Sequence, residues 1–251
     1  MPGLWRRAHR LILLACALAG LPLHSGPLSQ RPQLVLDPGF HTAAITRLAV
    51  SRDAARILST CNDKTARLFD PEGRLVQVLR VPRDAGHEGK LNAAALTADG
   101  AWAAVGGWTG VDAEKTASVY LFETGSGRLT GRISGLPGVV TALAFPHAGS
   151  NPAHLAIALG SGGLRIVDCQ RGAEIFSDSG YAERCLAAEW DAEGRALVTV
   201  SWDGILRLYQ AESGGYAKRV EQRLQGGQRP CTLSLAGSET GGGLLIAVGF
   251  V

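Results

Sequence analysis

A unit of about 45 residues recurs along the chain, and this repetition restricts the fold more than any other feature of the sequence. Each unit holds three short apolar segments separated by turn residues, and a weaker fourth segment follows, as at Leu75–Leu79. Four units are complete, and a fifth stops after its second segment, Leu244–Val248. We align the residues of the second turn as Asn62, Trp108, Ser161, Trp202 and Phe250. Their separations of about 46, 53, 41 and 48 residues are close to the period of roughly 40–45 that four-stranded units show.

The repeated segments are apolar on both faces. Leu155–Leu159 and Ala196–Val200 contain almost no polar residue, whereas a sheet with one solvated face alternates apolar and polar residues. The blades of a β-propeller are four-stranded antiparallel sheets with their faces covered by their neighbours. We therefore predict an all-β chain whose residues 33–251 form a β-propeller of four blades and part of a fifth. Because the sequence stops inside the second turn of the fifth unit, a C-terminal truncation and an unclosed ring are expected.

Five short motifs stand out in these units: residues 39–41 (Gly-Phe-His), 86–87 (Gly-His), 68–70 (Leu-Phe-Asp), 106–110 (Gly-Gly-Trp-Thr-Gly) and 203–209 (Asp-Gly-Ile-Leu-Arg-Leu-Tyr). The first two are similar to the Gly-His that opens the repeats of WD (Trp-Asp) repeat proteins, and the third is similar to the Leu-Trp-Asp that closes their third strand. The last two resemble bacterial exported WD-repeat proteins in particular. Some of those exported proteins also carry a caspase-like peptidase domain. The resemblance implies a scaffold that binds protein partners.

The resemblance also implies a buried hydrogen-bond relay of Ser or Thr, His, Asp and Trp within each blade. The first unit offers His41, Ser59 and Asp63, with Phe69 in the position of the Trp. Phenylalanine has no N–H group, so the relay is expected to end there.

The fourth unit departs further from the pattern. It keeps Thr199 and Asp203, but Tyr209 replaces the Trp and no His opens the unit. We include Asp203 among the relay residues and expect this blade to be held mainly by packing. In the same family, a segment such as Gln33–Leu36 pairs with the last blade and closes the ring.

The first 29 residues differ from the rest of the chain. Arg6, Arg7 and Arg10 precede the uncharged apolar run Leu11–Ala19, and small residues and helix breakers follow. This layout predicts a secretory signal peptide over residues 1–29 and an exported protein, periplasmic or secreted. The run is shorter than the roughly 20 residues that span a bilayer, so no membrane span is expected. A retained N-terminal tail and a lipoprotein anchored through Cys16 remain alternatives.

Removing the leader changes the charge of the chain. Residues 1–29 hold three Arg and no acid, so Lys+Arg falls from 25 to 22 against 22 Asp+Glu. Nucleic-acid binders usually carry a basic patch or stripe, and no such run is present. We therefore expect no nucleic-acid partner.

The cysteines beyond the leader follow no metal-binding spacing. Cys61, Cys169, Cys185 and Cys231 form no Cys-x-x-Cys pair and do not cluster with histidines. No metal site is predicted, and the thiols are expected to act as small buried apolar groups. Cys185 and Cys231 are aligned at the start of the inner strand in neighbouring units, which leaves a disulfide between them open.

Sequence motifs for catalysis are not found. The chain lacks Gly-x-Ser-x-Gly, His-Glu-x-x-His and a phosphate-binding loop. Residues 160–163 (Gly-Ser-Gly-Gly) and 241–243 (Gly-Gly-Gly) fall between strands, where glycine serves a hairpin turn. We therefore predict a non-catalytic protein-interaction scaffold without a cofactor. The alternatives are a ligand-binding or hydrolytic propeller with a site in the central channel, and the sensor portion of a caspase-like peptidase.

Three aromatic residues in the aligned turn column are the candidate partner-binding residues. Trp108, Trp202 and Phe250 stand where turns usually carry Gly, Asn, Asp or Ser. Exposed aromatics on a loop-rich face are typical interface anchors, and the insertion Val111–Ala117 is expected to lie beside Trp108. The alternative is that each ring folds back onto a neighbouring blade and only adds buried apolar area.

The leader gives a first testable prediction. N-terminal sequencing of the exported protein is expected to start after Ala19, Ser25 or Ser29, because small residues follow the apolar run. An intact Met1 would contradict a cleaved signal peptide.

Overall fold

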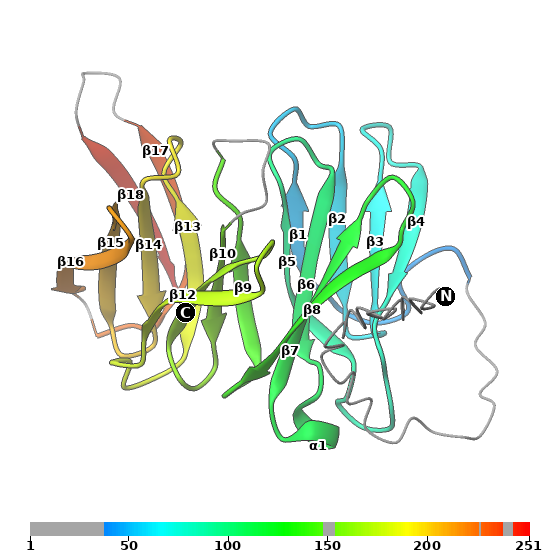
Figure 1. Ribbon diagram of the computed structural model, residues 1–251, viewed down its shortest axis with the longest axis horizontal. Coiled ribbons are helices and arrows are strands. Elements are labelled where there is room, and N and C mark those ends of the chain that lie inside the picture. The colour runs from blue at the N-terminus through cyan, green and yellow to red at the C-terminus, as the bar shows by residue number, and fades with distance from the viewer. Residues whose placement is uncertain (1–37, 148–153, 226, 238–242) are drawn as a thin grey trace, which may run out of the picture.

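The computed structural model describes residues 38–147, 154–225, 227–237 and 243–251 (Figure 1). The strands pair in chain order into four antiparallel sheets of four strands and one sheet of two strands. The first blade holds β1 (Ile45–Val50), β2 (Ile57–Cys61), β3 (Thr65–Phe69) and β4 (Leu75–Arg80), and the second holds β5 (Lys90–Leu96), β6 (Trp102–Trp108), β7 (Ala117–Glu123) and β8 (Leu129–Leu136). The third holds β9 (Val140–Ala144), β10 (His154–Leu159), β11 (Leu164–Asp168) and β12 (Ala173–Asp178), and the fourth holds β13 (Cys185–Trp190), β14 (Ala196–Ser201), β15 (Ile205–Glu212) and β16 (Gly215–Arg223). The fifth holds β17 (Pro230–Gly237) and β18 (Leu244–Phe250).

This arrangement confirms the predicted all-β architecture of four blades and part of a fifth. The insertion after β6 forms the four-residue helix α1 (Val111–Glu114). Within the described ranges, no helix has the length and apolar character needed to cross a bilayer.

Apolar side chains fill the space between successive blades. Leu58 and Leu68 of the first blade pack with Leu91 and Val105 of the second, and three further clusters join the second to the third, the third to the fourth and the fourth to the fifth blade. The second strands β6, β10 and β14 are buried almost throughout, whereas the outer strands β4 and β16 are largely exposed. Complete burial of one such leucine stabilises the fold by about 2 kcal/mol. The strands are therefore apolar on both faces because neighbouring blades cover both faces, as predicted.

Polar side chains also join the inner strands of neighbouring blades, which are the first strands β1, β5, β9, β13 and β17. Each inner strand is shifted in register by one residue near its start, a shift typical of a β-bulge. At this bulge Thr46 Oγ1 donates a hydrogen bond to the carbonyl of Leu91 at 2.6 Å, and Thr141 Oγ1 donates to the carbonyl of Cys185. The bulged residue of one blade therefore satisfies a carbonyl of the next blade.

The two ends of the row of blades have uncovered apolar faces. In the first blade Ile45, Leu48 and Val50 of β1 are 56%, 61% and 55% exposed, and Leu245 of β18 is 67% exposed. No sheet joins the first and fifth blades among the described strands, which agrees with the predicted open ring. Figure 1 shows the blades side by side, from the blue first blade to the red strands of the fifth.

The turn between β10 and β11 depends on glycine. Gly162 and Gly163 have φ angles of +84° and +75°. A Cβ atom on Gly163 would lie 2.1 Å from the carbonyl oxygen of Asp178. The Gly-Ser-Gly-Gly segment is therefore a strand-to-strand turn, as predicted, and it has no helix after it that would bind phosphate.

Candidate interaction face and channel groove

The segments leading into the inner strands share one face of the molecule with the turns after the second strands. We call this the proximal face, and α1 marks it at the lower side of Figure 1. Backbone hydrogen bonds define its register: Asn62 N donates to Ala44 O, Gly160 N to Val139 O, Trp202 N to Arg184 O and Val251 N to Arg229 O. Lys90 pairs with Trp108 in the same way.

This register corrects the aligned turn column. The equivalent residues are Asn62, Trp108, Gly160, Trp202 and Val251, so that Ser161 and Phe250 are each displaced by one position. Phe250 is the last residue of β18, pairs with Pro230 and is 37% exposed. The second strands of these units are apolar over neighbouring positions, so the apolar pattern alone does not fix the register to one residue. Only two of the three proposed aromatics therefore lie in the turn column.

The three relay residues of the first blade lie in direct contact. His41 Nδ1 lies 2.9 Å from Asp63 Oδ2, and His41 Nε2 lies 2.7 Å from Ser59 Oγ. A carboxylate only accepts, so Nδ1 carries the proton and Nε2 accepts from the serine hydroxyl. Burial alone would raise the pKa of Asp63, but hydrogen bonds from Thr65, His41 and the backbone of Thr42 lower it to about 2. The relay fixes the segment leading into β1 against β2 and β3.

The relay also includes two of the three side chains that form the one potential metal-binding group found in the described ranges. Donor atoms of His41, Cys61 and Asp63 lie within 4.8 Å of one another. Both imidazole nitrogens already have hydrogen-bond partners, and Cys61 Sγ donates to the carbonyl of Ala43. Burial raises the pKa of the Cys61 thiol, which favours the protonated form that binds metals poorly. The hydrogen-bonded relay therefore accounts for this cluster.

The fourth blade has a polar network where packing alone was expected. Tyr181 lies four residues before the first inner-strand residue, as His41 does, and its hydroxyl lies 2.6 Å from Thr199 Oγ1 and 2.8 Å from the Tyr209 hydroxyl. Tyr209 donates to Asp178 Oδ2 at 2.8 Å. Burial raises the pKa of the Tyr181 and Tyr209 phenols, so both remain neutral. The expectation was wrong because a tyrosine replaces the histidine.

Asp203 lies outside this network. Its carboxylate pairs with Arg207, whose Nη2 lies 2.9 Å from Asp203 Oδ2, and both side chains are at least 95% buried. The Arg207 guanidinium also donates to the carbonyl of Gly180 and lies over the Tyr181 ring at 4.1 Å. Asp203 therefore anchors the fourth blade through an ion pair and not through a serine–histidine relay.

The second blade uses a buried carboxylate instead of a relay. Glu88 is 6% exposed and accepts hydrogen bonds from the backbone N–H groups of Gly110 and Asp112. It thereby anchors the insertion that forms α1, which begins three residues after Trp108. The Trp108 ring is half-buried and packs at a tilt against His87, with ring centroids 5.2 Å apart.

Trp202 has a different environment. Its indole is half-buried, and two guanidinium groups lie over the ring, with Arg184 Cζ at 5.3 Å and Arg229 Cζ at 4.8 Å from the centroid. Arg184 and Arg229 occupy equivalent positions directly before the inner strands of two neighbouring blades. The indole N–H is buried and has no acceptor among the described residues. By contrast, Trp190 is 1% exposed and donates to the carbonyl of Ala144, as a core tryptophan does.

The cysteines are free thiols wherever they are described. Cys185 precedes the bulge of its inner strand, whereas Cys231 occupies the bulge and is equivalent to Thr46. The two thiols are therefore not in equivalent positions, which corrects their alignment. Burial raises the pKa of the Cys185 and Cys169 thiols to about 12.

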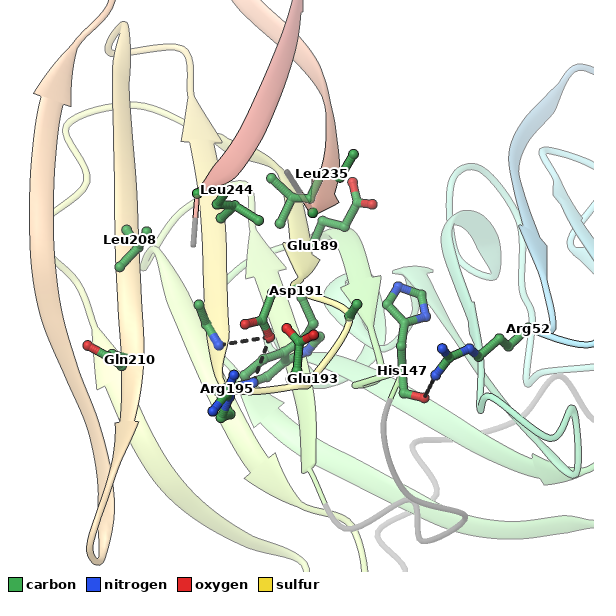
Figure 2. Close-up of a pocket in the computed structure, with 16 residues that line it drawn as sticks. Arg52, His147, Glu189, Asp191, Glu193, Arg195, Leu208, Gln210, Leu235 and Leu244 are labelled. Carbon is green, nitrogen blue, oxygen red and sulfur yellow. Dashed lines mark hydrogen bonds between the residues drawn. The ribbon is translucent and has the colours of Figure 1, made fainter. Parts of the chain in front are cut away.

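A groove of about 620 Å³ opens on the opposite, distal face, between the third, fourth and fifth blades (Figure 2). Arg52, His147 and three carboxylates line it together with apolar residues of β15, β17 and β18. The carboxylates are Glu189, Asp191 and Glu193. Asp191 accepts hydrogen bonds from the backbone N–H groups of Arg195 and Ala196 and so belongs to the turn.

Glu189 occupies an unusual position in this groove. Register places it where the other full blades have Ala49, Ala95 and Ala144. Burial raises the pKa of its carboxyl group. Among the described residues, the His147 side chain forms no hydrogen bond or ion pair with any of the three carboxylates.

Several residues of these sites were missed by the sequence analysis. Tyr181 could have been found from its spacing, since it stands as far before its strand as His41. A second signal is a basic residue at the equivalent position where the chain enters the inner strand, which is Lys90, Arg184 or Arg229 in three of the units. It could have pointed to the arginines at Trp202. Glu88 has no comparable signal, because its role depends on the conformation of the insertion.

Comparison with known proteins agrees with this geometry. The sequence model of the WD domain, G-beta repeat matches residues 33–70. The WD40 repeats of RRP9 superpose with a TM-score of 0.59 at 20% identity, covering 71% of this chain and 52% of that one. U3-55K superposes with a TM-score of 0.58 at 21% identity, again covering 71% and 52%. The chain thus spans about half the length of these solved structures, and its fold is that of WD40-repeat β-propeller blades. The comparison with curated proteins finds no match.

The relay of the first blade gives a prediction about stability and pH. Asp63→Asn is expected to lower the free energy of unfolding by about 2 kcal/mol at pH 7, because it weakens several buried hydrogen bonds. The pKa of Asp63 is lower in the folded chain than its ordinary value of 3.8. Its contribution is therefore complete above about pH 4 and is lost as the pH falls towards 2.

Urea unfolding of wild type and variant across this pH range measures the effect. The difference between them should shrink between pH 4 and pH 2, whereas exposed Glu72→Gln should change stability little at any pH. A difference that stays constant down to pH 2 would contradict the pKa assigned to Asp63.

Proposed function

We propose that this chain is a non-catalytic scaffold that binds a protein partner through its proximal face. The observation that carries the proposal is the state of Trp202, which lies half-buried under two exposed arginines and outside the apolar clusters between blades. Tryptophan and arginine are the residues most enriched among those that dominate binding energy in interfaces. WD40-repeat propellers are in general protein-interaction scaffolds, which supports the same assignment.

The proposal includes export of the protein to the periplasm or the medium. Its support is the basic, apolar and small-residue layout of residues 1–29, which lie outside the described residues. A near-neutral charge beyond the leader fits a protein partner better than a nucleic acid.

A hydrolytic function at the distal groove has weaker support. His147 has no hydrogen bond to a carboxylate, and no serine, threonine or cysteine lines the groove in the described part of the chain. Burial and the nearby Arg52 lower the pKa of His147, which leaves it neutral at pH 7 but gives it no nucleophile to activate.

Site-specific photo-crosslinking tests the scaffold function. A benzophenone side chain would replace Glu183 or Gln228, which are exposed and adjacent to Arg184 and Arg229. Matched controls carry the same group at Glu72 or Ser126, which are exposed in turns of the distal face. We expect discrete protein adducts from the two proximal positions in the native compartment and none from the controls. Adducts only from the distal positions, or none from any position, would contradict the proposal.

A further inference from the structure

The Trp202 cluster holds two exposed arginines that have no carboxylate partner. Elsewhere in the described ranges, six arginines at or near the surface are paired with a carboxylate: Arg74, Arg128, Arg132, Arg165, Arg171 and Arg219. Arg184 and Arg229 are exposed, and neither guanidinium has an ion pair or hydrogen bond to a described residue. Two guanidinium groups thus contact one ring, and neither has a carboxylate partner among the described residues.

The geometry leaves the hydrogen-bond donors of these arginines available. A guanidinium group is planar, and its five N–H donors point outward in that plane. When its face is engaged by an aromatic ring, the donors at its edge remain free to bind a carboxylate with two parallel hydrogen bonds. The indole of Trp202 restricts both side chains, which lowers the entropy lost when an anion binds.

The charge of the proximal face extends beyond this cluster. Lys64, Arg83 and Lys90 lie near one another at the junction of the first two blades, where the pKa of Lys64 is lowered by burial and by its two cationic neighbours. Three carboxylates of this face are buried and already bonded: Asp63 to His41, Asp203 to Arg207 and Glu88 to the backbone of Gly110 and Asp112. Asp84, Asp112 and Glu183 are exposed on the same face. The face therefore has mixed charge, within which the Trp202 cluster offers two cations without a carboxylate partner.

We propose that Arg184 and Arg229, held over Trp202, bind the carboxylates of an acidic segment in the partner protein. This inference rests on the proposed scaffold function and names the chemistry of its partner. An acidic peptide is favoured over a nucleic acid because the basic residues form two separate groups and not the continuous stripe that follows a phosphate backbone.

Binding of fluorescein-labelled hexaglutamate to the full chain, followed by anisotropy at low salt, tests the inference. Hexaglutamine with the same label is the uncharged control. Wild type is expected to bind hexaglutamate at least about tenfold more tightly than hexaglutamine, since charge-assisted hydrogen bonds are lost with the neutral peptide. Arg184→Gln and Arg229→Gln are each expected to weaken hexaglutamate binding by about tenfold.

Three further measurements test whether binding depends on the Trp202 cluster in particular. Trp202→Leu is expected to weaken binding severalfold, because the arginines lose the ring that orients them. Arg74→Gln removes an exposed arginine of the distal face and should leave binding unchanged. Quenching of tryptophan fluorescence by hexaglutamate should disappear in Trp202→Leu, which reports occupation of this site independently of affinity.

Several outcomes would overturn the inference. Equal binding of the two peptides, unchanged binding in both arginine variants, or an equal loss in Arg74→Gln would each do so. Tighter binding of a deoxythymidine 12-mer, with the same dependence on Trp202, would assign the cluster to nucleic acid instead. Crosslinked partners at Glu183 and Gln228 without hexaglutamate binding would refute the acidic segment and leave the scaffold function standing. Hexaglutamate binding without crosslinked partners would refute the scaffold function and leave the site's affinity for carboxylates standing.

Discussion

The apolar faces of each sheet are covered by the neighbouring sheets, and the remaining structure depends on this mutual burial. Leu58 and Leu68 are fully buried because the second blade covers them, and Leu155 and Ile157 because the second and third blades pack together. A single sheet without its neighbours would expose these residues to water and lose the stabilisation that their burial provides. The bulged threonines of the inner strands add hydrogen bonds between blades.

Because packing between blades provides most of the stability, the loops of the proximal face are anchored by different local chemistry in each blade. The first blade uses a histidine relay, the second a buried glutamate, and the fourth a pair of tyrosines beside an Arg207–Asp203 ion pair. These anchors use the buried carboxylates Asp63, Glu88 and Asp203. Arg184 and Arg229 are left unpaired on Trp202, where they are available to a ligand.

The blades were predictable from the sequence because their period and their two-sided apolar character are properties of single strands. Register was less predictable, since an apolar pattern on both faces of a strand does not distinguish neighbouring positions, and Phe250, Ser161 and Cys231 were each aligned one residue away from their true equivalents. Tyr181 was missed because it makes the histidine's contact to Thr199 with a different side chain. The cluster at Trp202 joins residues from two repeats, and its geometry depends on how neighbouring blades pack, which no single repeat encodes.

Native-state hydrogen exchange tests most directly whether burial on both faces stabilises each blade. Amides of β6 and β10, which lie in blades covered on both sides, are expected to exchange at least about tenfold more slowly than those of β1 and β18 after correction for intrinsic rates. This difference in exchange rate is expected because one face of each end blade is uncovered, as the exposed side chains of Ile45, Leu48 and Leu245 show. Protection of β18 equal to that of β10 would show that a blade is stable without a neighbour on each face and would contradict the account.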